Sequence, residues 1–201
     1  MIYLCPHIEH IPQDELDKVF AALPSAERAH IESTAAPGLR RQRLAARWVL
    51  QRLLMDEFGL SAIPAVARTR LGKPVFIGEQ DGVFFNLAHS GGCAAAIAAP
   101  TAAGIDVECL RGDIPRGAMH RSFTAAEQSH ISSPEDFFAH WTRKESLLKA
   151  MGQSVNQMRD HSLPVGRPRF AYAGYHFLCG REGDIFWAGC QKEKEPVFRL
   201  L

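Results

Sequence analysis

The sequence predicts an α+β protein made of two halves, in each of which helices come before strands. A helical pattern of apolar residues over residues 39–58 precedes short strand-like runs over residues 65–99. Helix signals return over residues 124–152, and strand-like runs follow again over residues 169–200. The repeated order of elements predicts two α+β halves that meet near residues 99–104.

In the first half, residues 13–23 form a short amphipathic pattern that is acidic at its start and ends at Pro24. Ser25 is then in place to cap a second helix. The long helical pattern over residues 39–58 ends at Gly59, a residue suited to the left-handed helix end. Turn-forming sequences then separate the strand-like runs: Leu71-Gly72-Lys73-Pro74, Asp81-Gly82 and Ser90-Gly91-Gly92.

In the second half, Gly104–Glu108 is a strand candidate, and Thr124 and Glu127 have the spacing of a capping box. A longer helix begins with Ser133 as N-cap and a proline in the first helical position, and it ends before Gly152. The tail of the chain predicts three short strands. We therefore divide the chain into residues 1–103 and 104–201.

The composition is that of an ordinary globular protein. Of the 201 residues, 46% are hydrophobic, and 23 Lys and Arg nearly balance 22 Asp and Glu, for a net charge of +1. Nucleic-acid-binding proteins generally carry a large basic excess, and disordered chains lack apolar residues. We therefore expect a folded chain with no nucleic-acid partner.

Five cysteines, an odd number with no C-x-x-C pair, exclude a complete disulfide framework and a common zinc ribbon. Reduced thiols in the cytoplasm are the simplest interpretation. The first residues lack the pattern of a secretory signal, and the most apolar segment, residues 93–105, is too short to cross a bilayer. We expect a cytoplasmic protein with no membrane partner.

Two acidic residues, Asp106 and Glu108, alternate with Ile105 and Val107 in the strand candidate. Residues two apart project from the same face of a strand, about 7 Å apart at their Cα atoms. Two neighbouring anions repel unless a cation or a proton lies between them. A solvated acidic face is the commoner origin of such a pattern, so the pair alone does not establish a cation site.

The helix that follows Ser133 carries Glu145 and Lys149 on one side, in line with Phe138 and Thr142. Taken alone, a Glu–Lys pair of this spacing is an exposed ion pair worth about 0.3–0.5 kcal/mol and has no function. It gains importance if this side of the helix meets the acidic strand.

Residues 85–92 run from a strand into two glycines, which let a ligand approach the backbone closely. Asn86, His89 and Ser90 could donate to a phosphate. The alternative is an ordinary turn in which Asn and Ser bond to their own backbone. No G-x-S-x-G sequence surrounds Ser90, so a hydrolase elbow is not supported.

Eight basic and two acidic residues lie between Arg40 and Lys73. Polyphosphate recognition, docking of an acidic partner and a solvated helix face all explain such an excess. The motifs G-x-x-x-x-G-K-[ST], G-x-G-x-x-G and H-E-x-x-H are absent. Their absence disfavours P-loop, dinucleotide-binding and zincin chemistry.

Together, four motifs resemble the 4′-phosphopantetheinyl transferases of the surfactin-synthetase-activating (Sfp-like) class. Each motif alone is weak, but their order and spacing fit the class over roughly residues 43–149. The motifs are Gly72-Lys73-Pro74, Phe85-Asn86-Leu87-Ala88-His89-Ser90, Gly104-Ile105-Asp106-Val107-Glu108 and Trp141-Thr142-Arg143-Lys144-Glu145-Ser146-Leu147-Leu148-Lys149.

The resemblance implies a pseudo-twofold pair of similar α+β halves in one chain, which acts as a monomer. The family transfers the 4′-phosphopantetheine group of coenzyme A to a serine of an acyl- or peptidyl-carrier protein and releases adenosine 3′,5′-bisphosphate. The resemblance further implies that the chain is a holo-carrier-protein synthase that depends on Mg²⁺ and uses coenzyme A as co-substrate. Residues 1–103 then recognise the adenine and 3′-phosphate, and residues 104–201 carry the metal-binding and catalytic carboxylates.

By the same resemblance, Asp106, Glu108 and Glu145 bind Mg²⁺ against the coenzyme A pyrophosphate, and oxygen ligands shared with phosphates suit this ion. The catalytic residues are Glu145, Lys149 and Asp106. Lys149 contacts the phosphate, while Glu145 or a metal-bound water takes the serine proton. Contacts to coenzyme A are implied for Arg43, Arg47, Lys73, Pro74, Asn86, His89 and Ser90, with Arg28 as a further candidate.

The chain departs from the family pattern at two places. Ala88 stands where many relatives have serine, which removes one possible phosphate donor. The segment Trp141–Ser146 mixes features of two subgroups, so it assigns neither the carrier protein nor the pathway. Two alternatives stay open: a noncatalytic relative that binds coenzyme A, and another Mg²⁺-dependent phosphoryl-transfer enzyme.

Overall fold

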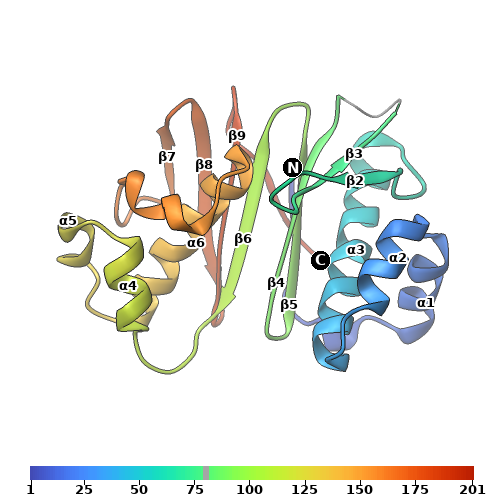
Figure 1. Cartoon of the computed structure of the whole chain (residues 1–201), viewed down its shortest axis with the longest axis horizontal. Coiled ribbons are helices and arrows are strands. Elements are labelled where there is room, and N and C mark those ends of the chain that lie inside the picture. Colours follow the sequence, from blue (N-terminus) through green and yellow to red (C-terminus); the bar gives the residue numbers. More distant parts are fainter. Residues whose placement is uncertain (79–81) are drawn as a thin grey trace.

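Two sheets stand side by side in the middle of the molecule, and helices cover both outer sides (Figure 1). The structure is a computed structural model and describes residues 1–78 and 82–201. It confirms the predicted α+β class and the pair of similar halves, since each half lays one long helix on a four-stranded sheet.

In the first half, α3 (Pro37–Phe58) packs mainly on β5 (Cys93–Ala99). Pro37 starts the helix, and Gly59 ends it with a φ of 68°, as the sequence predicts. The other elements of this half are β1 (Ile2–Cys5), the 3₁₀ helix η1 (Ile8–His10), α1 (Gln13–Ala22), α2 (Ser25–Glu32), β2 (Val66–Arg68), β3 (Pro74–Phe76) and β4 (Phe84–Ser90).

In the second half, α6 (Pro134–Met151) packs on β6 (Ala103–Cys109) and β9 (Ile185–Lys192). The predicted capping at Ser133 is confirmed, and Gly152 ends the helix with a φ of 67°. The other elements are α4 (Arg116–Ser122), α5 (Ala125–Gln128), the 3₁₀ helix η2 (Val155–Asp160), β7 (Arg169–Tyr172), β8 (Tyr175–Glu182) and β10 (Phe198–Leu200).

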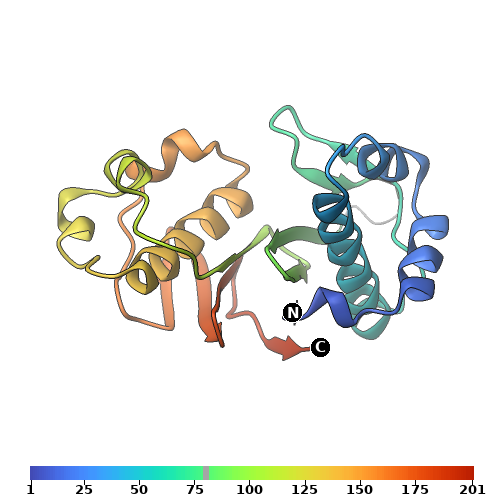
Figure 2. The same cartoon turned by 90° about the horizontal axis from the view of Figure 1, so that it is seen from below.

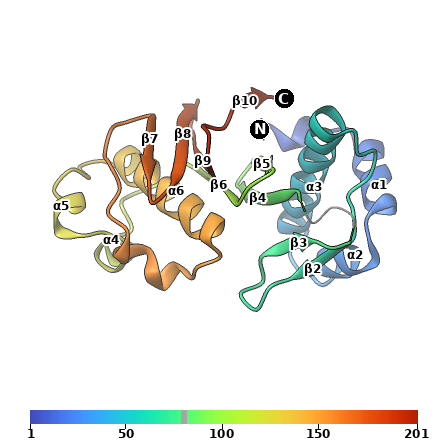
Figure 3. The same cartoon turned by 90° about the horizontal axis from the view of Figure 1, so that it is seen from above.

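The strand order is β10-β1-β5-β4 in the first sheet and β6-β9-β8-β7 in the second. All neighbouring strands are antiparallel except β1 and β10, which are parallel. The two termini therefore lie close together (Figures 2 and 3). The last strand belongs to the sheet of the first half, although its residues fall in the predicted second half.

The two sheets pack against each other through the faces that the helices leave free. Ile2 and Ile97 of the first sheet share an apolar cluster with Ile105 and Trp187 of the second. Gly189 lets the sheets approach each other closely: a Cβ at this position would lie only 2.4 Å from Cδ1 of Ile2. Alternate residues of β6 therefore face the other sheet, and the residues between them face α6.

The structure corrects several element predictions. Ser25 is the first residue of α2, and Pro24 occupies the N-cap position, so Ser25 does not cap this helix. Four strands, not three, occupy the tail. The strand β1 and the helix α4 were not predicted.

Two predicted turns are confirmed. Residues 71–74 lie at the turn between β2 and β3, and Gly91, with a φ of 54°, lies in the turn between β4 and β5. Of the third predicted turn, Asp81 lies outside the described residues. No helix in the described part of the chain has both the length and the apolar character needed to span a membrane.

We expect Gly104→Ala to lower the free energy of unfolding by about 2 kcal/mol or more, because overpacking against backbone cannot relax by side-chain rotation. A Cβ at Gly104 would lie 2.1 Å from the carbonyl oxygen of Ser146. Urea unfolding measures the loss. The control is Gly38→Ala in α3, where a Cβ meets nothing within 4 Å and a small gain is expected. Equal stability of the two variants would contradict the close contact of β6 with α6.

Candidate active site

The contact between β6 and α6 builds the site. A Cβ at Gly104 would also lie 2.5 Å from the amide nitrogen of Ala150, so the backbone of α6 rests directly on the strand at this glycine. Residues two and four further along a strand share the same face. Asp106 and Glu108 therefore point toward the helix that carries Glu145 and Lys149.

Asp106 is the buried centre of this group, with 5% of its surface exposed. Its Oδ1 accepts a hydrogen bond of 2.5 Å from Nζ of Lys149. Its Oδ2 is buried and has no hydrogen-bond partner among the residues that the structure describes. A buried oxygen without a partner is costly, and in native sites it often faces an ion or water.

Three carboxylates surround one ammonium group. Burial is the main cause that raises the pKa of Asp106, Glu145 and Glu108 add to this rise and Lys149 opposes it, and the resulting pKa is about 7. Burial alone would lower the pKa of Lys149, but Asp106, Glu145 and Glu108 outweigh burial and raise it. Three carboxyl groups thus act on one ammonium group.

Glu108 is held by one residue from each half of the molecule. Oγ of Ser90 donates a 2.7 Å hydrogen bond to its Oε2, and Arg111 lies 3.1 Å from the same oxygen. Ser90 ends β4, so the acidic face of β6 and the end of β4 meet at this point. The sequence-predicted residues Ser90, Asp106, Glu108, Glu145 and Lys149 are therefore brought together.

This group suits a hard divalent cation. The partnerless oxygen of Asp106 and the surplus of carboxylates provide the oxygen ligands and negative charge that Mg²⁺ requires. Within the described residues, however, no three His, Cys, Asp or Glu side chains already stand together as a metal cage. The three-carboxylate metal site accordingly stays a prediction.

Arg43 gives the site a basic side, which also carries the neutral His89. Nη1 of Arg43 donates a 2.6 Å bond to Thr34, and Nδ1 of His89 lies 3.1 Å from Oε1 of Gln42. Burial, together with the positive charges of Arg47, Lys149 and Arg43, lowers the pKa of His89 to about 4. His89 is thus neutral near pH 7 and lies between α3 and the acidic group.

Two residues of the predicted coenzyme A site make internal bonds. Arg47 is buried, and its Nε and Nη2 donate to Glu27 at 3.0 and 2.6 Å. Asn86 is also buried, and its Oδ1 accepts a 3.0 Å bond from the backbone of Ile105, joining β4 to β6. Both residues thus help to hold the fold together, and their contacts to coenzyme A stay predictions.

Lys73 joins the two halves. From the β2–β3 hairpin, its Nζ donates to the carbonyl oxygens of Lys149 at 2.5 Å, Ala150 at 3.3 Å and Ala103 at 3.4 Å. The last carbonyls of a helix have no partner within the helix, and a cation there is favourable. Lys73 therefore holds the end of α6, while Pro74 begins β3 beside it.

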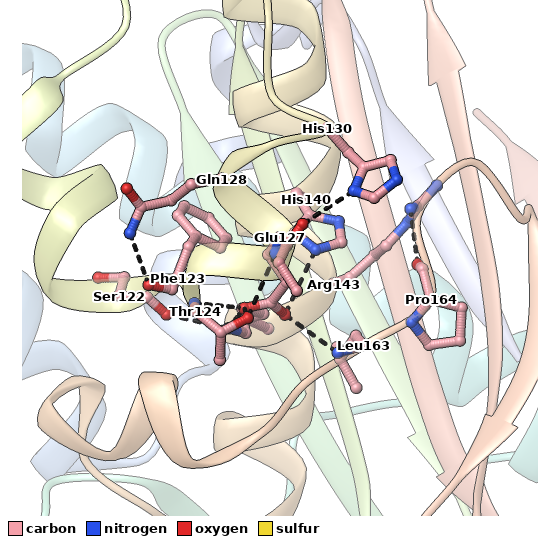
Figure 4. A network of polar contacts seen from close by, with 12 residues as sticks. Ser122, Phe123, Thr124, Glu127, Gln128, His130, His140, Arg143, Leu163 and Pro164 are labelled. Atoms are coloured by element: carbon pink, nitrogen blue, oxygen red, sulfur yellow. Dashed lines mark hydrogen bonds and ion pairs between the residues drawn. The ribbon is translucent and has the colours of Figure 1, made fainter.

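A buried network holds the middle of α6 from its other side (Figure 4). Lys144 is fully buried, and its Nζ donates to Glu127 at 2.7 Å and to the carbonyl of Ser122 at 2.9 Å. Glu127 also accepts backbone bonds from Thr124 at 2.8 Å and Leu163 at 3.1 Å. Successive helix residues are about 100° apart, so the direction of Lys144 fixes that of Glu145.

The sequence analysis missed the part that Lys144 plays. The capping-box pattern did identify Glu127, and the capping box is confirmed. Nothing in the pattern indicated that the same carboxylate reaches a lysine 17 positions later in the chain.

Comparison with known proteins points to one family. A sequence profile of the 4′-phosphopantetheinyl transferase superfamily matches residues 102–196. The chain is 32% identical to the 4′-phosphopantetheinyl transferase AcpT of Salmonella typhimurium over 140 residues, which cover 65% of this chain and 70% of that protein. It is 29% identical to the 4′-phosphopantetheinyl transferase HetI of Nostoc over 163 residues, which cover 74% of this chain and 68% of HetI.

A mammalian protein is also similar. The L-aminoadipate-semialdehyde dehydrogenase-phosphopantetheinyl transferase of Mus musculus is 33% identical over 131 residues, which cover 54% of this chain and 41% of that protein.

We expect Lys73→Met to lower the free energy of unfolding by about 1–3 kcal/mol, because carbonyl groups at the end of α6 lose a charged donor. Urea unfolding provides the measurement. Lys18→Met is the control, since Lys18 makes only an exposed pair with Asp14, and its loss is expected to cost under about 0.5 kcal/mol. A Lys73→Met protein as stable as the wild type would rule out the role at the helix end.

The Glu127 network predicts an acid-dependent loss of stability. Burial alone would raise the pKa of Glu127, but the imidazole of His140 at 3.4 Å and the bonds from Lys144 and two backbone amides outweigh burial and lower the pKa to about 2, from an ordinary value of 4.5. A carboxyl whose pKa is lower in the folded state stabilises the fold above pH 4.5, and this contribution is lost as the pH falls toward 2.

Unfolding free energies at pH 6 and pH 3 test this expectation. The wild type should lose about 2 kcal/mol more over this interval than the double variant Glu127→Gln/Lys144→Met. The double variant removes both charges and so leaves neither one buried alone. Parallel losses in the two proteins would show that Glu127 titrates normally.

Proposed function

The chain belongs to the 4′-phosphopantetheinyl transferase family, and we propose that it transfers the 4′-phosphopantetheine group from coenzyme A to a serine hydroxyl of an acyl- or peptidyl-carrier protein, releasing adenosine 3′,5′-bisphosphate. The observation that carries this proposal is the buried Asp106, which is paired on one oxygen with Lys149 and open on the other, beside Glu145 and Glu108. Such a group can bind a divalent cation, and the cation together with Lys149 would hold a diphosphate and neutralise the charge that develops on it.

Mg²⁺, held by Asp106, Glu108 and Glu145, would neutralise the phosphate oxygens during transfer. The partnerless Oδ2 of Asp106 and the surplus of carboxylates support this assignment. Ser90 supports it as well, because its bond to Glu108 orients that carboxylate.

The chain's own residues supply the remaining chemistry. The ammonium of Lys149 donates to a phosphate oxygen and offsets its charge in the transition state. Glu145, either directly at a carboxylate oxygen or through a bound water, accepts the proton of the attacking serine hydroxyl. The two groups lie one helical turn apart on α6, which the bonds of Lys73 and Lys144 hold in place.

The adenine and 3′-phosphate of coenzyme A are assigned to the basic side of the site. Arg43 and His89 are the first contacts, because the positive charges of both Arg43 and Lys149 act on His89, which places His89 near both. Ser90 and Pro74 are the other two residues that we assign to coenzyme A binding. Lys73 contributes by holding its hairpin against the end of α6, since its Nζ is bonded to carbonyl oxygens.

We assign the reaction to the cytoplasm and to a single chain. All five cysteines are free, which fits a reducing compartment. One chain supplies both sides of the site: Arg43 and Ser90 come from the first half, and Asp106 and Glu145 come from the second. A second copy is therefore not needed to complete it.

Labelling of a carrier protein tests the function. The protein is incubated with coenzyme A, Mg²⁺ and an apo carrier protein, and the carrier should gain the mass of one phosphopantetheinyl group.

Glu145→Gln should lower kcat by about 100-fold or more and leave the melting temperature within a few degrees. Glu135→Gln, the same change in the first turn of α6, should keep full activity.

Other outcomes of this assay would favour the alternatives. If coenzyme A binds but none of the acyl- or peptidyl-carrier proteins tried gains mass, the chain is a noncatalytic relative. If coenzyme A is consumed while no carrier is labelled, the chain catalyses another phosphoryl transfer. Unfolding of Glu145→Gln would show that Glu145 is structural.

Arg43→Ala should raise KM for coenzyme A about 10-fold and change KM for dephospho-coenzyme A much less, because a charged hydrogen bond to the 3′-phosphate is lost. Steady-state kinetics with both substrates measure the difference. Arg52→Ala is the matched control, since Arg52 lies on the same helix and pairs with Glu15 instead. Equal increases for both substrates would remove Arg43 from the 3′-phosphate site.

A further inference from the structure

Two thiols from different halves of the molecule meet beside the site. Cys93 is the first residue of β5, and Cys109 is the last residue of β6. Their sulfur atoms lie 3.8 Å apart, and neither is bonded to another cysteine. The pair therefore bridges the seam between the two sheets.

The turn between β4 and β5 holds both thiols. Each thiol donates to the carbonyl oxygen of Ser90, Cys93 at 3.0 Å and Cys109 at 3.1 Å. Gly91 leaves room for the second sulfur, because a Cβ at this glycine would lie 2.9 Å from Sγ of Cys109. The local backbone thus brings the two sulfur atoms to a common point.

The two thiols differ in their access to solvent. Cys93 is fully buried, whereas Cys109 is half-buried. A small reagent from solution therefore reaches Cys109 first, and Cys93 lies behind it. This is the arrangement of a reacting thiol with a resolving partner.

We propose that Cys93 and Cys109 are a reversible oxidation site, which forms an intramolecular disulfide when a low-molecular-weight disulfide reacts with Cys109. The sulfur of Cys109, as thiolate, attacks one sulfur of the small disulfide, forms a mixed disulfide and expels one thiolate. Cys93 then loses its proton, attacks Sγ of Cys109 and expels the second thiolate. In total, two protein thiols are oxidised and one small disulfide is reduced to two thiols.

The required movement is small. A disulfide bond is about 2.05 Å long, so the sulfur atoms must approach each other by a little under 2 Å, which side-chain rotation and a slight shift of the strand ends supply. Both residues stand at strand ends next to the β4–β5 turn.

The bond would disturb the neighbouring carboxylate. Ser90 donates to Glu108 at 2.7 Å and accepts from the backbone amide of Cys109 at 3.4 Å. Oxidation removes both thiol donors from the Ser90 carbonyl. It also pulls on Cys109, which directly follows Glu108 in β6. This consequence for activity rests on the proposed function, whereas the disulfide itself does not.

Peptide mapping tests the disulfide directly. The whole protein is treated with oxidised glutathione and digested without reduction. A peptide that links Cys93 to Cys109, two hydrogens lighter than the reduced pair and split by dithiothreitol, is expected. In the Cys93→Ala variant, glutathione should instead remain attached to Cys109. Cys5→Ala is the control and should form the same link as the wild type.

Two results would overturn the oxidation site. One is the absence of the linked peptide under conditions in which Cys93→Ala takes up glutathione at Cys109. The other is that oxidation joins Cys93 or Cys109 to a different cysteine.

Carrier labelling tests the link to activity. Oxidation should lower the labelling rate of the wild type at least five-fold, dithiothreitol should restore it, and Cys109→Ala should be unaffected by the oxidant. A fully formed disulfide with an unchanged labelling rate would overturn the effect on the site. If the reduced protein labels no carrier, the proposed function fails. The disulfide proposal is then still tested by the mass of the peptide that links Cys93 to Cys109.

Discussion

The close contact of α6 with β6 is the constraint on which the rest of the site depends. Gly104 lets the backbone of the helix rest on the strand, and only this spacing places Lys149 within 2.5 Å of Asp106. The same contact removes Asp106 from water while leaving one of its oxygens without a protein partner. Burying a charge is unfavourable unless something compensates it, so the packing itself creates the need for a cation.

Three sets of bonds keep the helix in this position. Lys73 reaches across from the first half to the last carbonyls of α6, and Lys144 ties its middle to Glu127 on the far side. The capping box at Ser133 fixes its first turn. Because these bonds come from different elements, a change in any one of them alters the direction of Glu145 and Lys149 without touching a substrate.

The meeting of the two sheets explains why the site lies between the halves. Asn86 and Ser90 of β4 bond to the backbone of Ile105 and the side chain of Glu108 in β6, although the two strands belong to different sheets. The acidic residues come from one half and the basic residues of α3 from the other. A polyphosphate ligand fits this arrangement. A cation bound by the acidic residues and the basic side chains of α3 can each neutralise a different phosphate group.

Local patterns predicted the elements well. Gly59 and Gly152 end their helices, Ser133 starts one, and the alternation of Ile105, Asp106 and Val107 predicted a strand with one acidic face. These signals depend only on neighbours in the sequence. The predicted convergence of Asp106, Glu145 and Lys149 rested on the family resemblance, because spacing alone could not show that the strand meets the helix.

Contacts between distant residues could not be predicted. Arg47 binds Glu27 from 20 positions away, and Lys73 binds the carbonyl of Lys149 from 76 positions away. A basic residue on a helix shows the same pattern whether it faces a ligand or a buried carboxylate. For the same reason, the parallel pairing of β10 with β1 joins the two ends of the chain with no signal in either segment.

Binding of Mn²⁺, a paramagnetic substitute for Mg²⁺, tests the central claim most directly. Electron paramagnetic resonance counts free Mn²⁺ as the protein is titrated in the presence of coenzyme A. The account predicts one saturable site per chain, at least ten-fold weaker in Asp106→Asn and unchanged in Asp113→Asn, whose side chain is exposed. Equal Mn²⁺ affinity of Asp106→Asn and the wild type would contradict it.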